Sequence, residues 1–327
     1  MPPVKEAPLW RKIQKNNFVK LDSLADFLQL SPEKKLTLKQ KQAFPLNIPK
    51  RLAEKIEKNS LHDPIFLQFV STENKSQSIL NSSKDPVKDS SFQKTPYLLH
   101  KYQGRVLFLP TGACAMHCRY CFRQNFNYQP SNHEFSKEKD YLQKDSSIHE
   151  VILSGGDPLS LSNQKLHSIL SMLNSINHLE IIRFHTRFPI GIPERIDSDF
   201  LKMLKNSCKQ IIFIVHINHP EELDKDVSLS LKRIQSLGIP VLCQSVLLKG
   251  VNDNIHSLKD LFLKLAKNGI IPYYLHMLDL VDGSESFFVE EERASSLVLK
   301  LRETLPGYAV PQLVREVPYK PYKTPVY

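Results

Sequence analysis

Six short apolar runs, spaced along the chain from residue 105 onward, constrain the fold more than any other feature. They are rich in β-branched residues and cover 105–110, 150–154, 180–186, 210–217, 240–248 and 271–278. Amphipathic helical patterns lie between or after the later runs, at 161–176, 195–206, 220–237, 254–268 and 289–305. Continuous apolar strands that alternate with such helices are typical of parallel βαβ units, buried on both faces. Six strands therefore predict an α/β fold built on a partial (β/α)6 barrel rather than a closed eight-stranded one.

The chain before the first run has a different pattern. Residues 1 to about 70 repeat apolar side chains at roughly helical spacing, and Ser31-Pro32-Glu33 has the form of a helix N-cap followed by proline. Residues 71–94 are rich in Ser, Asn, Lys and Asp, which predicts a loop or connector. We therefore divide the chain into an N-terminal helical region and connector (1–100), a barrel core (101–288), and a C-terminal helix with a short tail (289–327).

Three cysteines, Cys114, Cys118 and Cys121, follow the first apolar run with the spacing C-x3-C-x2-C. Three thiolates can hold three irons of a [4Fe–4S] cluster and leave the fourth iron open to another ligand. A structural zinc site usually takes four ligands, often as two cysteine pairs, and the sequence has no second pair. His117 could complete a zinc site only in a strained geometry, because it lies between the cysteines. The spacing favours a cluster.

The remaining cysteines and the start of the chain bear on the cellular compartment. A disulfide framework is a poor fit to a 327-residue chain with five cysteines, and Cys208 and Cys243 lie in apolar segments where ordinary buried thiols are expected. The first residues, Met-Pro-Pro-Val-Lys-Glu, lack the apolar stretch of a secretory signal. No apolar run approaches the roughly 20 residues that span a bilayer. We expect a protein of the reducing cytoplasm, without a membrane partner.

Polar residues follow several of the predicted strands. Gly155, Gly156 and Asp157 come after the second strand, His216 ends the fourth, and Gln244 lies on the fifth. Adjacent glycines allow a backbone to approach a ligand closely, although the same residues also form plain tight turns. A histidine at a strand end is more often structural than a ligand. Because active sites of such barrels gather at the carboxyl ends of the strands, these groups are expected to converge on one site.

The cysteine motif directly after an apolar strand resembles the signature of the radical S-adenosylmethionine (SAM) enzymes. The resemblance implies a [4Fe–4S] cluster on Cys114, Cys118 and Cys121, whose open iron SAM chelates through its amino and carboxylate groups. It also implies that the segment 155–157 binds the methionyl amino group, and that His216 and Gln244 lie near SAM. In this family the radical chemistry belongs to the cofactor rather than to side chains.

Longer segments narrow the resemblance to the lysine 2,3-aminomutases, which also use pyridoxal 5′-phosphate (PLP). The matching segments include Leu-His-Lys-Tyr-Gln-Gly-Arg-Val-Leu-Phe-Leu, Cys-Arg-Tyr-Cys-Phe-Arg, His-Ile-Asn-His-Pro, Gln-Ser-Val-Leu-Leu-Lys-Gly-Val-Asn-Asp and Pro-Tyr-Tyr-Leu-His-Met-Leu-Asp, and the match runs from about residue 60 to 325. The short C-terminus resembles the bacterial branch that makes (R)-β-lysine for elongation factor P. The resemblance thus implies L-lysine as substrate, a reductant such as flavodoxin or ferredoxin, and a functional link to elongation factor P and its lysyl-ligase.

The same resemblance assigns the residues of the substrate site. It places PLP on Lys323, its phosphate on Arg105, the substrate carboxylate on Arg123 and the lysine ε-ammonium on Asp279. Position alone would instead make Lys323 a solvated side chain in a frayed tail, and Lys320 is its nearest rival. Larger family members have a second aspartate before a glycine-rich segment, and this chain has Arg-Glu-Val-Pro-Tyr-Lys there. That difference leaves the strictness for free lysine open.

The charge balance suggests one rival function. The chain has 44 basic and 34 acidic residues, a net charge of +10, which is compatible with nucleic-acid binding. The lysines are scattered through amphipathic segments and no aromatic-interleaved RNA-binding motif stands out, so direct nucleic-acid binding is not expected. The alternatives are a mutase for another amino acid and a non-enzymatic iron–sulfur redox or RNA-binding regulator. Asp279 argues against glutamate as substrate, and a homo-oligomer remains compatible with the sequence.

Overall fold

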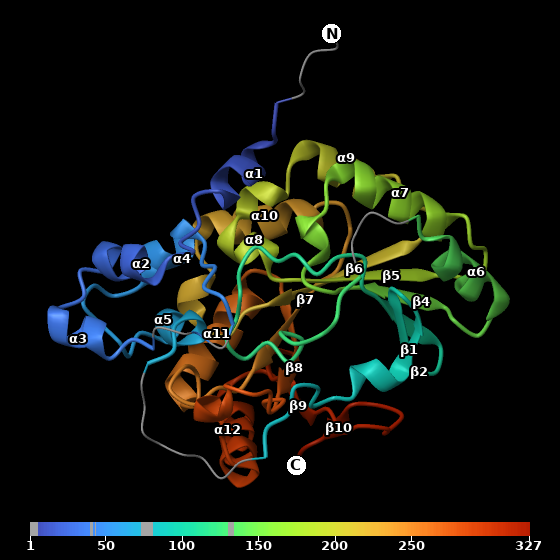
Figure 1. Cartoon of the computed structure of the whole chain (residues 1–327). Helices are drawn as coiled ribbons and strands as arrows, with labels where there is room; N and C mark the ends of the chain where they lie inside the picture. The colour runs from blue at the N-terminus through green and yellow to red at the C-terminus, as the bar shows by residue number, and fades with distance from the viewer. Residues whose placement is uncertain (1–5, 40–41, 43, 73–80, 130–133) are drawn as a thin grey trace.

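A ten-stranded sheet forms the centre of the molecule in the computed structural model, which describes residues 6–39, 42, 44–72, 81–129 and 134–327 (Figure 1). Its strands lie in sequence order: β1 (Gln93–Thr95), β2 (Leu98–Tyr102), β3 (Arg105–Phe108), β4 (Glu150–Leu153), β5 (Ile181–Thr186), β6 (Gln210–His216), β7 (Val241–Val246), β8 (Ile271–His276), β9 (Gln312–Arg315) and β10 (Thr324–Pro325). Neighbours from β3 to β9 pair in parallel. The edges are antiparallel, with β1 and β2 before β3 and β10 after β9.

The six predicted strands correspond to β3–β8, and the α/β fold class predicted from their spacing is confirmed. The predicted helices are α7 (Asn163–Asn174), α9 (Ser198–Lys205), α10 (Lys225–Gln235), α11 (Ile255–Lys267) and α12 (Glu291–Thr304). Strands β1, β2, β9 and β10 and helices α6 (Ser136–Lys144) and α8 (Phe188–Gly191) were not predicted. Short 3₁₀ turns complete the chain: η1 (Asp89–Phe92), η2 (Pro158–Ser160), η3 (Pro193–Arg195), η4 (Pro220–Glu222), η5 (Glu285–Phe287) and η6 (Gly307–Ala309).

The N-terminal region is helical, as predicted, but its helices are short. They are α1 (Leu9–Gln14), α2 (Leu21–Phe27), α3 (Pro32–Leu36), α4 (Lys50–Lys55) and α5 (Pro64–Phe69). The predicted cap is present, since the Ser31 hydroxyl accepts from the Lys34 amide at the start of α3. Part of the predicted connector, residues 73–80, lies outside the described residues. Figure 1 shows α2–α5 at the left of the molecule and the edge strands β1 and β2, with α6, at the right.

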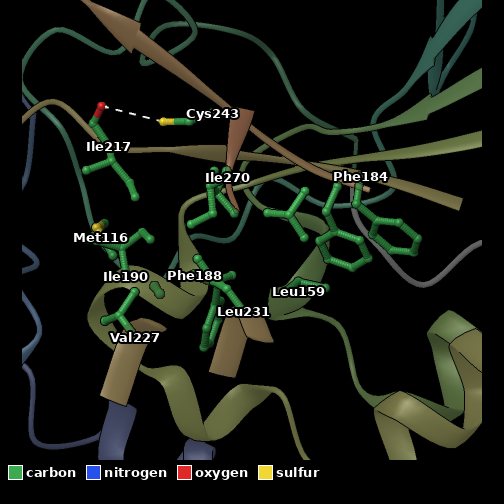
Figure 2. Packing of buried hydrophobic residues seen from close by; sticks show 14 of the residues in the cluster. Met116, Leu159, Phe184, Phe188, Ile190, Ile217, Val227, Leu231, Cys243 and Ile270 are labelled. Atoms are coloured by element: carbon green, nitrogen blue, oxygen red, sulfur yellow. Dashed lines mark hydrogen bonds between the residues drawn. The ribbon is translucent and has the colours of Figure 1, made fainter. Parts of the chain in front are cut away.

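One hydrophobic core joins the N-terminal helices to the barrel. Trp10 of α1 packs edge-on against Phe188, with ring centroids 5.5 Å apart. Figure 2 shows Met116, from the segment that carries the cysteines, among buried side chains that include Ile190 and Ile217. Because these contacts come from distant parts of the sequence, the N-terminal region is part of the wall around the barrel.

Two earlier expectations concern isolated features. Cys243 is buried, as expected, and its thiol points to the Ile217 carbonyl (Figure 2). Cys208 is exposed, so the expectation of a buried thiol was wrong there; it lies in the turn between α9 and β6, where only neighbouring apolar residues enter the core. Among the described residues, helices that are long and apolar enough to cross a membrane are absent.

Candidate active site

A cavity of about 820 Å³ lies inside the curved sheet, and every site residue predicted from the sequence lines it. Side chains from β3 through β9 contribute to its wall, together with the segment that carries the cysteines and with Tyr322 and Lys323 of the tail. A volume near the upper end for ligand pockets leaves room for more than one small molecule. Lys320, the rival to Lys323, is exposed and does not line the cavity.

The cysteine loop, residues 111–123, follows β3 and is held from outside by the N-terminal region. The Asn17 side chain donates to the Ala115 carbonyl at 2.7 Å, and the His117 amide donates to the Asn47 carbonyl at 2.9 Å. Further along, the Arg119 amide donates to the Gln68 carbonyl at 2.9 Å. Backbone groups of a loop are fixed well by such bonds, because each one left unmade costs free energy. The N-terminal region, through segments between its helices and through α5, therefore helps to hold the loop that presents the cysteines.

The three thiols of the loop suit a cluster. Burial raises the pKa of Cys114 well above its usual range, and burial together with the neighbouring Cys118 raises the pKa of Cys121 to about 11. Without metal, Cys114 and Cys121 therefore hold their protons at neutral pH, and bound iron would displace those protons. No set of three or more His, Cys, Asp or Glu side chains in the described ranges is spaced to hold a single metal ion. The donor set, three sulfurs facing a shared cavity, fits separate irons of one cluster.

The turn at 155–157 packs directly on the cysteine loop. Gly156 donates its amide to the Thr111 carbonyl, and Asp157 donates its amide to the Ala113 carbonyl, both at 2.8 Å. A Cβ on Gly155, whose φ is +116°, would lie 2.4 Å from the Thr111 oxygen, and one on Gly156 would lie 2.4 Å from the Ala113 oxygen. The glycines are thus needed for the contact between two backbones, as well as lining the cavity.

The Asp157 carboxylate is used inside the protein. It accepts hydrogen bonds from the amides of Leu159, Arg187 and Phe188 and from the Thr186 hydroxyl. Burial raises its pKa to about 6, even though these hydrogen bonds act in the opposite direction. Its geometry ties the end of β4 to the end of β5, so this residue fixes the turn that faces the cavity.

His216 and Gln244 lie side by side at the ends of β6 and β7, where they are register partners. The His216 ring stacks on Tyr120, and its Nε2 lies 2.9 Å from the Tyr120 hydroxyl. Burial, with the nearby Arg187 charge, lowers the pKa of His216 to about 3, so the imidazole is neutral at physiological pH. Neutral polar groups at this position can bind a ligand through hydrogen bonds without adding charge.

Lys323 enters the cavity because the tail folds back as a strand. Thr324 and Pro325 form β10, which pairs with β9, and the Val326 amide donates to the Leu313 carbonyl at 3.0 Å. The Lys323 ammonium donates to Glu316 at 2.9 Å, and its side chain is 28% exposed. The frayed-tail alternative is therefore not what the structure shows, since the lysine lines the same cavity as the cysteines.

Arg105, Arg123 and Asp279 occupy the rest of this wall. The Arg105 guanidinium lies over the Tyr102 ring at 4.7 Å, and within the described part of the chain it makes no ion pair. Arg123 donates through Nε to Asp89 at 2.7 Å, and its Nη atoms make no hydrogen bond within the described residues. Burial raises the pKa of Asp279 to about 7, against the opposing charge of Lys323. Two arginines suit anionic groups of ligands, and a buried carboxyl group suits a cationic one.

Comparison with known proteins identifies the family. A family model described as a 4Fe-4S single cluster domain matches residues 103–188, which include all three loop cysteines. An L-lysine 2,3-aminomutase of Haemophilus influenzae is 37% identical over 327 residues, 99% of this chain and 97% of the relative. The chain belongs to the L-lysine 2,3-aminomutase family. Family members from Escherichia coli (36% identical, 93% of this chain and 90% of the relative) and Clostridium subterminale (32%, 97% and 77%) align as well.

Among solved structures the chain is similar to Streptococcus suis SuiB bound to S-adenosylmethionine. The TM-score is 0.50 at 13% identity, over 66% of this chain and 51% of that chain, so the likeness extends to about half of SuiB and concerns the fold. Membership in the aminomutase family confirms the resemblance inferred from the sequence and, with it, the isomerase class. The predicted cofactors, a [4Fe–4S] cluster, SAM and PLP, are those of this family.

Three lining residues of this family member were missed by sequence reasoning. Glu316 accepts from Lys101, Lys323 and the Tyr102 hydroxyl, and Lys101 is a second lysine in the cavity. Arg187 lies just after β5 and contacts Cys118. Glu316 lies in the Arg-Glu-Val-Pro segment, which the sequence comparison marks only by the absence of the second aspartate of larger family members. The sequence places Glu316 seven residues before Lys323. That spacing brings the two side chains together only because β10 folds back on β9.

Proposed function

We propose that the protein converts L-lysine into (R)-β-lysine by a 1,2-amino shift that depends on SAM and PLP. The observation that carries the proposal is the convergence of three thiols, Lys323, Arg123 and Asp279 on one cavity. When bound, the cluster and SAM supply radical chemistry, and PLP holds the nitrogen that migrates. Family membership at 37% identity over nearly the whole chain supports this reaction.

The chain's own residues bind and orient. Cys114, Cys118 and Cys121 hold three irons, while the turn at 155–157, His216 and Gln244 face SAM. Lys323 carries PLP, and Arg105, which the described contacts leave without an ion pair, binds its phosphate.

Both ends of the amino acid then have a partner. The Nη atoms of Arg123 donate hydrogen bonds to the substrate carboxylate, while its Nε keeps its bond to Asp89. Asp279 binds the ε-ammonium, since a cation would restore the charge that burial disfavours. Glu316 would keep Lys101 and the Tyr102 hydroxyl as partners once Lys323 carries PLP. Asp279 is therefore the carboxyl group that favours a substrate with a cationic side chain and opposes glutamate.

We further propose that the product serves the modification of elongation factor P, through its lysyl-ligase, in the cytoplasm. The support is the sequence of the C-terminal segment, which resembles the bacterial branch named above, together with the similarity to the relatives from Haemophilus influenzae and Escherichia coli, 37% and 36% identical. A low-potential electron donor such as flavodoxin or ferredoxin completes the proposed set of partners. The test is to purify elongation factor P from cells that contain this chain and from cells that lack it, and to compare the two by mass spectrometry. The proposal predicts a β-lysyl modification only in the first sample.

The first experiment examines the protein purified without oxygen. We expect broad iron–sulfur absorbance, a pyridoxyl group on Lys323 after borohydride reduction and peptide mapping, and β-lysine by mass spectrometry after addition of SAM, dithionite and lysine. Lys323→Ala should remove the adduct and lower turnover at least about 10³-fold, because the nitrogen carrier is lost. Lys320→Ala, the matched control on the exposed tail, should leave both unchanged. An adduct on Lys320 or Lys101 would overturn the assignment of Lys323, and a cluster without any PLP would overturn the reaction.

A further inference from the structure

Arg187 is the centre of a buried polar network that reaches one of the cluster cysteines. Its side chain is 8% exposed, and it follows the last residue of β5. Nη1 donates to Cys118 Sγ at 2.7 Å and to the Tyr120 hydroxyl. Nη2 donates to Gln68 Oε1 and to Glu222 Oε2, each at 2.7 Å. A single guanidinium thus joins the cysteine loop to α5 and to η4.

The partners of Arg187 are themselves fixed. The Asn218 side-chain amide donates to Gln68 at 3.0 Å and to Tyr120 at 2.8 Å. The Gln68 side chain donates to Glu222 at 3.2 Å, and Glu222 also accepts from the Asn218 amide. Within the described residues only Arg187 Nε of this network lacks a hydrogen-bond partner. Any other arrangement of these side chains would leave more buried polar groups unpaired, so this one is favoured. The guanidinium is therefore held in place beside the sulfur before any cofactor binds.

We propose that Arg187 is a positioning residue that sets the reduction potential of the cluster through its hydrogen bond to Cys118. The inference rests on Cys118 being a cluster ligand, as proposed above. On reduction the cluster takes up one electron from an external one-electron donor, and negative charge on its sulfurs grows. A donor hydrogen-bonded to a ligand sulfur stabilises that reduced form and raises the potential. Arg187 itself neither loses a proton nor forms a covalent bond.

Glu222 decides how the test must be built. It forms the ion pair with Arg187 and is fully buried, so removing the arginine alone would leave an uncompensated buried carboxylate. The double variant Arg187→Gln/Glu222→Gln removes both charges and keeps hydrogen-bonding groups of similar size. Arg187→Lys is a second variant, which keeps the positive charge but loses the planar fork that reaches Cys118 and Glu222 together.

The measurement is a dithionite titration of the reconstituted cluster, monitored by electron paramagnetic resonance, without SAM, PLP or lysine. We expect the double variant to be at least tenfold harder to reduce, a shift of 59 mV to lower potential for one electron, and Arg187→Lys to shift in the same direction by less. Arg195→Lys is the matched control, because Arg195 is fully buried and donates to the Leu159 and Leu161 carbonyls instead. It should lower thermal stability and leave the potential unchanged.

The outcomes separate this inference from the proposed function. Potentials of the two Arg187 variants equal to that of the parent protein would overturn it, whatever happens to stability or turnover. If the double variant does not fold, the Arg187→Lys potential decides. Failure of the parent protein to assemble any cluster would instead overturn the assignment of the cysteines, since the titration needs neither substrate nor PLP.

Discussion

The two ends of the cavity are held in different ways. At the cluster end, backbone groups of the cysteine loop bond to residues far away in the sequence, such as Asn17 and Asn47, and the turn at 155–157 packs against them. At the end proposed to bind PLP, charged side chains of the cavity wall pair with each other, Lys323 with Glu316 and Arg123 with Asp89. The first end is held by backbone hydrogen bonds and the buried Arg187–Glu222 ion pair, whereas the second is held mainly by ion pairs that line the cavity.

The difference follows from what each end must do. A cluster needs sulfurs at constant positions, and backbone contacts give little freedom. In the proposed function, Lys323 exchanges its bond to Glu316 for PLP, whereas Arg123 keeps Nε on Asp89 and uses its Nη atoms for the substrate. Neither change requires the backbone to move. Substitutions at the two ends should therefore have effects of different kind.

The largest expected effect is at the cluster end. Gly156→Ala would place a Cβ 2.4–2.6 Å from the backbone of Gly112 and Ala113, so the cysteine loop must move. We expect a loss of about 3 kcal/mol in the free energy of unfolding of the iron-free protein, measured in urea, and incomplete iron binding after reconstitution. Gly307→Ala is the control, because nothing lies within 4 Å of its added Cβ. If the two variants were equally stable, the close backbone contact at Gly156 would not be needed to hold the cysteine loop.

A smaller effect, with opposite signs for two carboxylates, is expected at the PLP end. Burial alone would raise the pKa of Glu316, but Lys323, Lys101 and Tyr102 lower it to about 2, below its usual 4.5. Its stabilising contribution is therefore present above pH 4.5 and is lost as the pH falls toward 2. Glu316→Gln should destabilise the PLP-free protein by about 2 kcal/mol at pH 7 and much less near pH 3.

The contribution of Asp279 to stability changes with pH in the opposite direction to that of Glu316. Its folded-state pKa of about 7 lies above its usual 3.8, so stability falls as the pH rises from about 4 to 7. Asp279→Asn should therefore stabilise the PLP-free protein at pH 8 by about 1–2 kcal/mol while it weakens lysine binding. Thermal unfolding from pH 3 to 8 measures both variants. Parallel pH profiles for Asp279→Asn and the parent protein would contradict this assignment.

The smallest effect tests the outer support of the cysteine loop. Asn17→Ala removes the bonds to the Ala115 carbonyl and to the Asn47 side chain, both at 2.7 Å. We expect a loss of about 1 kcal/mol in unfolding free energy, and slower cluster reconstitution followed by visible absorbance. Asn177→Ala, at an exposed position, should change neither. If the Asn17 variant reconstitutes at the parent rate, the N-terminal contacts do not shape the loop.

The strands that the sequence predicts form the parallel part of the sheet, β3–β8. Along β3, β5 and β7 one face is buried, and the other face lines the cavity and is only partly buried. Enough of their residues are apolar for the runs to be visible in the sequence. The hairpin strand β2, with sequence Leu-Leu-His-Lys-Tyr, and the two-residue β10 have weak patterns of their own. They become strands only because a neighbouring edge supplies hydrogen-bond partners, which a local pattern does not reveal.

In the candidate site, too, the sequence predicts features that are local in the chain and misses those that depend on distant partners. Cys114, Cys118 and Cys121 are close in sequence, so their spacing alone predicted one loop. Glu316 and Arg187 act through partners that the fold brings together; Arg187 lies 119 positions from Gln68 and 69 from Cys118. For Gly156 the sequence indicated a close approach of backbone, and the structure shows the cysteine loop as one partner of that approach.

The contacts that hold the cysteine loop also form late when the chain folds. Asn17 reaches Ala115 across 98 positions and Gln68 reaches Arg187 across 119, so these bonds require closure of long stretches of chain. Long-range closure is slow relative to the formation of a neighbouring hairpin such as β9–β10. For a time, the folding chain therefore has its three thiols but has not yet formed the long-range hydrogen bonds that hold the cysteine loop. Iron delivered during that interval meets a flexible peptide, and iron delivered afterwards meets a formed site.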